Sequence, residues 1–171
     1  GNLISVKNHK ILIKSMKEID AHLLIIGNGE LFEELNQLII ECAVQNKVTI
    51  KKSVPNNQIQ DYYKSAKIFA LAYNTEVESL PMPVMEAMAT GLPIVIPFPK
   101  KGYSEGLEET VLFSENNVLA FTNNIKKLLE SEILMGKYSK KSLEKAKEFD
   151  ISKIEHKESE IYSKLIRGIK D

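Results

Sequence analysis

The sequence predicts an α/β domain built on an open parallel sheet of about six strands, with helices on both faces. Short apolar runs recur along the chain, and stretches with helical spacing of apolar residues separate them. This alternation is typical of right-handed βαβ units, in which a helix connects each pair of parallel strands. The length of 171 residues suits a single domain with a full core and is too short for two ordinary α/β domains.

The composition is that of a soluble globular protein, with 43% apolar and 27% charged residues. Lys plus Arg equals Asp plus Glu at 23 each, so no basic surplus favours a nucleic-acid partner. The single cysteine, Cys42, excludes an internal disulfide and a Cys-based zinc site, and we expect it to be a small buried hydrophobe. No apolar run approaches the roughly 18 residues that a membrane span needs. We therefore expect a cytoplasmic protein.

The first elements follow from apolar patterning. Residues 1–6 are interpreted as a strand that the chain enters abruptly, so we expect a piece cut from a longer protein. Residues 7–19 carry apolar side chains at helical spacing. Residues 22–27 form a continuous apolar run that ends in Gly27, which is typical of a strand buried on both faces of a parallel sheet.

The same alternation continues through the middle of the chain. Residues 31–45 have one apolar helical face, and residues 48–50 make a short strand. Asn57 is expected to cap a helix over 58–65. Residues 68–72 are another buried strand.

The second half begins with a helix from Pro83 that ends at Gly91 and Pro93. Residues 98–110 are a polar connection, expected to be partly helical and the most mobile stretch. The remaining expected elements are strands at 93–96 and 111–113 and helices at 117–130, 137–148 and 151–169.

In open parallel sheets, ligands bind beyond the carboxyl ends of the strands. Several segments follow predicted strands and should meet along that one edge. They are Lys7, 27–29, Val54, 73–82 and 98–104.

One stretch on this edge, Glu78-Ser-Leu-Pro-Met-Pro-Val-Met-Glu86, combines a helix start with two carboxylates. Pro83 suits the first helical position, and the N–H groups of Val84 and Met85 should then be free at the positive end of the helix dipole. Such a helix start binds anions, and the flanking carboxylates can accept hydrogen bonds from hydroxyl groups. A nucleoside diphosphate sugar has that layout. Either Glu taken alone is more simply a first-turn acid that stabilises a helix.

The two glutamates, with seven residues between them, resemble the Glu-x7-Glu motif of retaining glycosyltransferases of family 4, which have the two-domain GT-B architecture with Rossmann-like halves. The resemblance implies that Glu86 binds the nucleotide ribose and that Glu78 contacts the donor sugar. It extends over essentially the whole chain. The implied identity is the C-terminal, nucleotide-sugar-binding domain over residues 1–171, with an N-terminal acceptor domain absent.

Other positions match the family less closely. Residues 1–9 resemble its Gly-Arg-Leu-x-x-x-Lys-Gly opening, with Lys7 in place to neutralise the donor diphosphate and Asn2 where the Arg usually stands. The turn at Gly29 implies a backbone contact to the nucleotide. Pro81 and Met82 replace a Gly-Leu pair, a departure that concerns the donor sugar. The implied site is completed by Pro83 and Val84 at the helix start, with Glu78 and Lys7 as catalytic residues.

No metal or other cofactor is expected. The Asp-x-Asp metal motif of the other major glycosyltransferase fold is absent, and the three histidines share no ligand spacing. His9 lies beside the expected site and could reach a phosphate, although a lone His has many structural uses.

We therefore expect the donor-binding half of an enzyme that transfers a hexosyl group from a UDP- or GDP-sugar to a glycan or lipid, inactive as a fragment. Its expected partners are the NDP-sugar, the missing domain and the acceptor, with peripheral membrane association possible for the full enzyme. The alternative is a stand-alone sugar-nucleotide-binding module without chemistry. A receiver-type signalling domain is set aside, because the turns after residues 26 and 72 lack its acidic residues.

Overall fold

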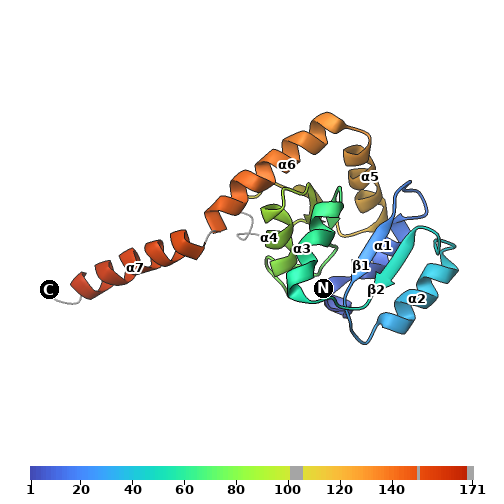
Figure 1. The fold of residues 1–171 in the computed structure, drawn as a ribbon, viewed down its shortest axis with the longest axis horizontal. Coiled ribbons are helices and arrows are strands. Elements are labelled where there is room, and N and C mark those ends of the chain that lie inside the picture. The colour runs from blue at the N-terminus through green and yellow to red at the C-terminus, as the bar shows by residue number, and fades with distance from the viewer. Residues whose placement is uncertain (101–105, 150, 169–171) are drawn as a thin grey trace.

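The chain folds into strands and helices that alternate along its length, as a computed structural model shows (Figure 1). The structure describes residues 1–100, 106–149 and 151–168. The last helix, α7 (Ile151–Gly168), projects away from the body that the other elements form (Figure 1). No helix in the described part of the chain is long and apolar enough to cross a membrane.

The strands are parallel throughout, which confirms the α/β class, but they form two separate sheets. In the first, β1 (Leu23–Ile26) pairs with β2 (Val48–Lys51), with Leu23 opposite Val48. In the second, β4 (Ile94–Pro97) lies between β3 (Phe69–Ala70) and β5 (Leu112–Ser114). The described residues thus hold five strands in two sheets, where the sequence predicts about six in one.

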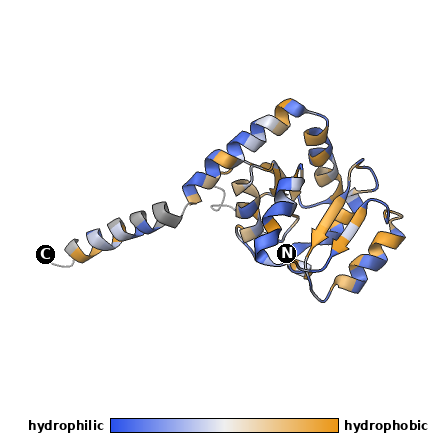
Figure 2. Cartoon of the chain, in the orientation of Figure 1, coloured by the Kyte–Doolittle hydropathy of each residue, from blue (hydrophilic) through white to orange (hydrophobic). Residues whose placement is uncertain are grey.

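The helices agree with the predicted ones in order and differ in several bounds. They are η1 (Ser5–Lys7), α1 (His9–Ser15), α2 (Phe32–Glu41), α3 (Asn56–Ser65), α4 (Met82–Ala89), α5 (Val118–Leu129), α6 (Glu132–Ala146), η2 (Lys147–Phe149) and α7. Figure 2 shows the helices with mixed hydrophilic and hydrophobic residues, whereas β1 and β2 are mainly hydrophobic.

Capping explains the corrected helix starts. Ser131 accepts a hydrogen bond from the Leu134 N–H, and this cap starts α6 at Glu132, five residues before the predicted 137. The predicted cap at Asn57 is wrong, because Pro55 precedes the helix and Asn56 already belongs to it. Asn117 does cap α5, through a bond from the Ala120 N–H.

Residues 1–6 are not a strand, contrary to the prediction. Leu3 is fully buried, and its N–H donates to the Asn28 carbonyl at 2.8 Å, so the chain start lies along the turn after β1. The following residues wind into η1, which ends where Asn8 takes a left-handed conformation with φ of 47°. Asn is one of the residues that tolerates this region, so the chain can turn there into α1.

Three apolar clusters form the core. β4 is buried along its whole length and separates two of them, one beneath α4 and one beneath α1 and α5. The third lies around β1 and α2 and includes Cys42, buried as predicted. The prediction that β1 is buried on both faces is wrong, because the Leu24 side chain is 40% exposed.

The polar connection predicted over 98–110 is described only in part. Residues 101–105, including the part of the predicted site edge at 101–104, lie outside the described residues. Residues 106–110 form turns that bury Leu107.

Candidate functional site

The segment after β3 is held against the start of the chain by backbone hydrogen bonds. The Asn74 N–H donates to the Val6 carbonyl at 2.8 Å, so the loop over 74–81 lies beside η1. The Asn74 side-chain oxygen accepts from the Glu76 N–H at 3.0 Å, and its carbonyl accepts from the N–H groups of Val77 and Glu78. This turn places Glu78 towards Lys7. Asn74 lies in the segment 73–82 that was predicted for the edge of the site, but it was not singled out; an Asn directly after a buried strand is the signal that could have done so.

Lys7 and Glu78, the two predicted catalytic residues, form an ion pair. The Lys7 Nζ lies 2.6 Å from Oε1 and 2.7 Å from Oε2 of Glu78, and only 11% of the Lys7 side chain is exposed. Partial burial strengthens such a charge-assisted contact relative to one in water. Tyr73 is buried next to this pair, and burial, with the Glu78 carboxylate as a second cause, raises the pKa of its hydroxyl to about 12. Tyr73 is therefore a neutral donor at physiological pH.

Helix α4 begins one residue earlier than predicted. Met82 holds the first helical position and is 63% exposed, so Pro83 takes the second position. The Val84 side chain is fully buried and its N–H donates to the Pro81 carbonyl at 2.9 Å, which corrects the prediction of a free Val84 donor. The dipole of α4 still leaves its positive end beside the loop that carries Glu78.

Glu86 lies on an exposed position one turn inside α4, where it meets a residue from another helix. Its Oε2 accepts a hydrogen bond from the Tyr63 hydroxyl of α3 at 2.8 Å. Burial, together with the bond to Glu86 and its charge, raises the pKa of Tyr63 above its ordinary value. Tyr63 therefore stays protonated and fixes the orientation of the Glu86 carboxylate. Nothing local in the sequence marks Tyr63, because the contact joins two helices 23 residues apart.

The glycines of the turn after β1 are approached by the chain's own backbone. A side chain at Gly29 would lie 2.4 Å from the Leu3 carbonyl oxygen, and one at Gly27 would overlap Gly1. Both positions therefore need glycine for internal packing. Asn2 is exposed beside this turn. Nucleotide contacts by Gly29 and Asn2 stay predictions.

His9 is buried at the start of α1, behind Lys7. The residue is 5% exposed, and its Nδ1 is the one buried side-chain nitrogen or oxygen that lacks a hydrogen-bond partner among the described residues. Burial, and secondarily the Gly1 amine and Lys7, lowers the pKa of His9 to about 4. A neutral, enclosed imidazole is a poor phosphate ligand, which favours a structural use for this side chain.

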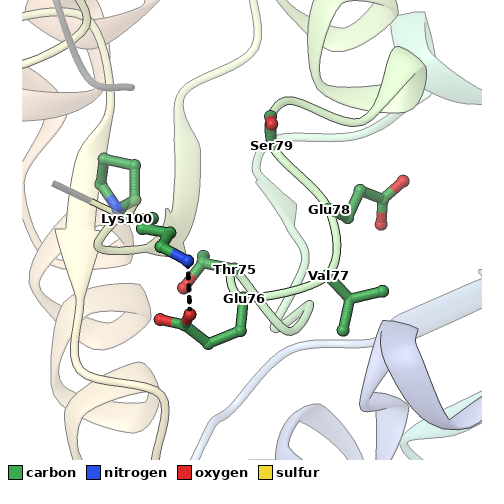
Figure 3. A pocket seen from close by; sticks show the side chains of 7 residues that line it. Thr75, Glu76, Val77, Glu78, Ser79 and Lys100 are labelled. Atoms are coloured by element: carbon green, nitrogen blue, oxygen red, sulfur yellow. Dashed lines mark ion pairs between the residues drawn. The ribbon is translucent and has the colours of Figure 1, made fainter. Parts of the chain in front are cut away.

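A small polar pocket of about 120 Å³ opens on the other side of the Glu78 loop (Figure 3). The Lys100 Nζ lies 3.0 Å from a Glu76 oxygen and joins the loop after β4 to the loop after β3. Figure 3 shows the Glu78 carboxylate pointing away from this pair. The pocket also contains Ser79, so polar groups line both sides of the Glu78 backbone.

The structure thus brings together most, but not all, of the predicted residues. Lys7 and Glu78 touch, while Glu86 and Pro83 lie on the same short helix that follows the Glu78 loop. Gly29 and Asn2 belong to a neighbouring turn, and Val84 faces the core. No group of three or more His, Cys, Asp or Glu side chains within the described residues is arranged to hold a metal ion.

Several proteins are similar to this chain in sequence. A protein from Haemophilus influenzae described as an uncharacterized glycosyltransferase is 35% identical over 136 residues, which cover 76% of this chain and 36% of the relative. A Campylobacter jejuni N-acetylgalactosamine-N,N'-diacetylbacillosaminyl-diphospho-undecaprenol 4-alpha-N-acetylgalactosaminyltransferase is 31% identical, with 90% and 42% covered. The chain therefore spans well under half the length of these relatives.

Solved structures share the fold. The crystal structure of Anabaena Alr3699/HepE in complex with UDP superimposes with a TM-score of 0.85 at 19% identity, over 96% of this chain and 47% of that one. The family model described as Glycosyl transferases group 1 matches residues 1–148, which is most of the chain. The predicted resemblance to GT-B glycosyltransferases with Rossmann-like domains is confirmed, and the chain belongs to the glycosyl transferases group 1 family.

Proposed function

We propose that this chain is the donor-binding, C-terminal half of a retaining glycosyltransferase that transfers a hexosyl group from an NDP-sugar to a glycan or lipid acceptor. The observation that carries the proposal is the Lys7–Glu78 pair beside the start of α4, with Glu86 oriented by Tyr63 one turn further on. The N-acetylgalactosaminyltransferase activity of the Campylobacter jejuni relative supports sugar transfer, and the UDP bound in the Anabaena structure supports a nucleotide donor.

The ion pair suggests how the donor diphosphate is held. A diphosphate carries more negative charge than one carboxylate, so it competes with Glu78 for the Lys7 ammonium. When the Lys7 ammonium exchanges Glu78 for the diphosphate, the Glu78 carboxylate becomes free to accept hydrogen bonds from hydroxyl groups of the sugar. The positive end of the α4 dipole adds to the attraction.

The same groups serve the chemistry. Negative charge grows on the leaving diphosphate as the bond to the anomeric carbon breaks, and a preorganised cation and dipole stabilise that charge. The backbone of Lys7 is held by η1 before the donor binds, so only its ammonium group has to exchange the Glu78 carboxylate for the diphosphate. We propose that no metal ion takes part, because Lys7 and the helix supply this charge.

Glu86 is proposed to accept hydrogen bonds from the ribose hydroxyl groups. Its second partner, the Tyr63 hydroxyl, holds one carboxylate oxygen and leaves the other available to the ligand. Acceptor groups would come from another domain of the whole protein, which we propose to act in the cytoplasm, at the membrane surface where the acceptor is a lipid. A binding module without catalysis remains the second candidate; detection of sugar transfer by the whole protein would exclude it.

The experiment that tests the proposal is a titration of the chain with UDP, GDP and ADP and with their common hexose conjugates. The melting temperature of the chain is measured at each ligand concentration. One nucleotide series should raise the melting temperature as its concentration rises. If no nucleoside diphosphate stabilises the chain at several millimolar, the donor-site proposal is contradicted.

A further inference from the structure

The loop that carries Glu78 has a second ion pair on its opposite side. Asn74 turns this loop by accepting hydrogen bonds from the N–H groups of Glu76 and Glu78, and the two carboxylates point to different sides of the backbone (Figure 3). Glu78 reaches Lys7. Glu76 instead lies 3.0 Å from the Nζ of Lys100, in the loop after β4. The proposed donor diphosphate uses only the Lys7 side and leaves the Lys100 side to another ligand.

The pair of Glu76 and Lys100 is much more open to solvent than the pair on the Lys7 side. The side chains of Lys100 and Glu76 are 55% and 68% exposed, and an ion pair this exposed contributes little to folding stability. A ligand can therefore take the place of either partner at a small cost. The pair leaves a carboxylate and an ammonium group side by side in the lining of the pocket.

The pocket beside this pair is small and mostly polar. Thr75 and Ser79 each add a hydroxyl group to its lining, and neither hydroxyl bonds to another described residue. Its volume of about 120 Å³ is about four times the ~30 Å³ that one water molecule takes in the liquid. The pocket therefore has room for one edge of a sugar ring and not for a whole nucleotide.

The charges of the lining favour a neutral ligand that carries hydroxyl groups. Lys100 is the only cation among the described lining residues, against the carboxylates of Glu76 and Glu78, so a phosphate meets no net positive charge. A carboxylate accepts a hydrogen bond from one hydroxyl group and an ammonium donates to the next, so neighbouring hydroxyl groups of a sugar satisfy both. Val77 and Pro99 supply apolar surface for the C–H groups of the ring.

We propose that this pocket is a subsite for one hexopyranosyl residue of the acceptor, with Glu76 and Lys100 as residues that determine acceptor specificity. The inference rests on the proposed function and deepens it, because it assigns the acceptor to sugars and not to phosphates or bare lipids. The backbone at Glu78 separates this subsite from the donor on the Lys7 side. This chain thereby adds one contact to an acceptor site whose other groups belong to another domain of the whole protein.

The test is an NMR titration of the chain, followed at its backbone amides, with the methyl α-glycosides of glucose, mannose, galactose and N-acetylgalactosamine. Glycerol at the same molarity is the control for unspecific effects of hydroxyl groups. One glycoside should shift the amides of Thr75, Glu76, Ser79 and Lys100, with Kd of about 1–50 mM for a ligand of about 13 heavy atoms. The shifts should persist with a saturating nucleoside diphosphate, because the two ligands lie on opposite sides of the loop.

Two variants test the residues that carry the subsite. Glu76→Gln removes the carboxylate charge and keeps the shape of the side chain. It should weaken binding of that glycoside by about fivefold or more and change the affinity for the nucleoside diphosphate by less than about twofold. Lys100→Met should have the same two effects. Lys141→Met is the matched control, since it breaks an exposed ion pair to Glu109 away from the pocket lining, and it should change neither affinity.

Two results would overturn the subsite. One is the absence of specific shifts with every glycoside up to about 100 mM, well beyond the expected Kd. The other is displacement of the glycoside by the nucleoside diphosphate, or a loss of NDP-sugar affinity but not of NDP affinity in Glu76→Gln, because the pocket would then hold the donor sugar. Failure of the proposed function is a separate result, in which no nucleoside diphosphate stabilises the chain whether or not a glycoside shifts the pocket amides.

Discussion

Lys7 and Glu78 lie 71 residues apart in the chain and form the closest ionic contact of the candidate site, with both carboxylate oxygens of Glu78 within 2.7 Å of the Lys7 Nζ. Neither side chain is fully exposed to solvent. The pair therefore holds the Glu78 loop against η1 and fixes the position of the Lys7 ammonium.

Lys7→Met should weaken binding of the preferred nucleoside diphosphate by about tenfold or more, because one charge-assisted contact is worth roughly 1.5–3 kcal/mol. The corresponding nucleoside monophosphate should lose less. Lys10→Met is the matched control, since Lys10 pairs with Glu34 at the surface. Calorimetric titration measures both; equal losses for the two variants would contradict a diphosphate role for Lys7.

Tyr63→Phe tests whether orientation of Glu86 matters. The variant removes one hydroxyl and leaves the ring, which packs 6.0 Å from the Phe69 ring between centroids, in place. Nucleotide affinity should fall only about three- to tenfold, roughly 0.6–1.4 kcal/mol, because Glu86 keeps its contact to the ligand and loses only the partner that orients it. Tyr62→Phe on the same helix should have no such effect. Unchanged affinity in Tyr63→Phe would mean that Glu86 needs no partner.

The buried His9 gives the stability of the chain a pH dependence with a definite sign. Its pKa is lowered to about 4 in the folded chain and returns to about 6.5 on unfolding. Between these two pH values only the unfolded state binds the extra proton. The contribution of the neutral His9 to the free energy of unfolding is therefore at its full value above about pH 6.5 and is lost as the pH drops to about 4. The whole loss is on the order of 3 kcal/mol.

His9→Phe should remove this slope between pH 6.5 and pH 4, while His22→Gln, at an exposed position bonded to Thr49, should retain it. Urea unfolding at a series of pH values gives the comparison. A slope shared by wild type and His9→Phe would assign the pH dependence to other groups.

Much of the fold could be predicted because it depends on local patterns. Apolar runs located β1, β2 and β4, and Asn117 marked the start of α5. Pro83 marked the start of α4, in error by one residue. These features depend on neighbours within one or two turns of the chain.

What the sequence could not predict depends on contacts between distant segments. The bond from Tyr63 to Glu86 and the packing of Gly29 against Leu3 appear only once the elements are assembled. The exposure of Leu24 is of the same kind, since an apolar run does not tell whether a neighbouring strand is present to cover it. The 3-10 turn at Ser5–Lys7 stands where a strand was predicted, and the chain start before it is bonded to the distant turn after β1, from the Leu3 N–H to the Asn28 carbonyl.

The isolated chain should bind an NDP-sugar weakly, with Kd of about 0.1–1 mM, because in the proposed half-enzyme a second domain supplies the other wall of the cleft and excludes water from the phosphates. Sugar transfer should be undetectable without the acceptor-binding domain, which has to align the reacting groups. A radiochemical assay on the chain alone and on the whole protein makes the comparison. Turnover by residues 1–171 alone would contradict the assignment as a half-enzyme.

The most direct test of the proposed site is a calorimetric titration of Glu86→Ala and Glu78→Ala with an NDP and with its NDP-sugar. Glu86→Ala should lose affinity for both ligands, by about tenfold or more, because the acceptor for the ribose hydroxyls is gone. Glu78→Ala should lose affinity for the NDP-sugar and keep nearly all of it for the NDP. Equal losses of NDP binding in the two variants, or no loss in either, would contradict the division of roles between the two glutamates.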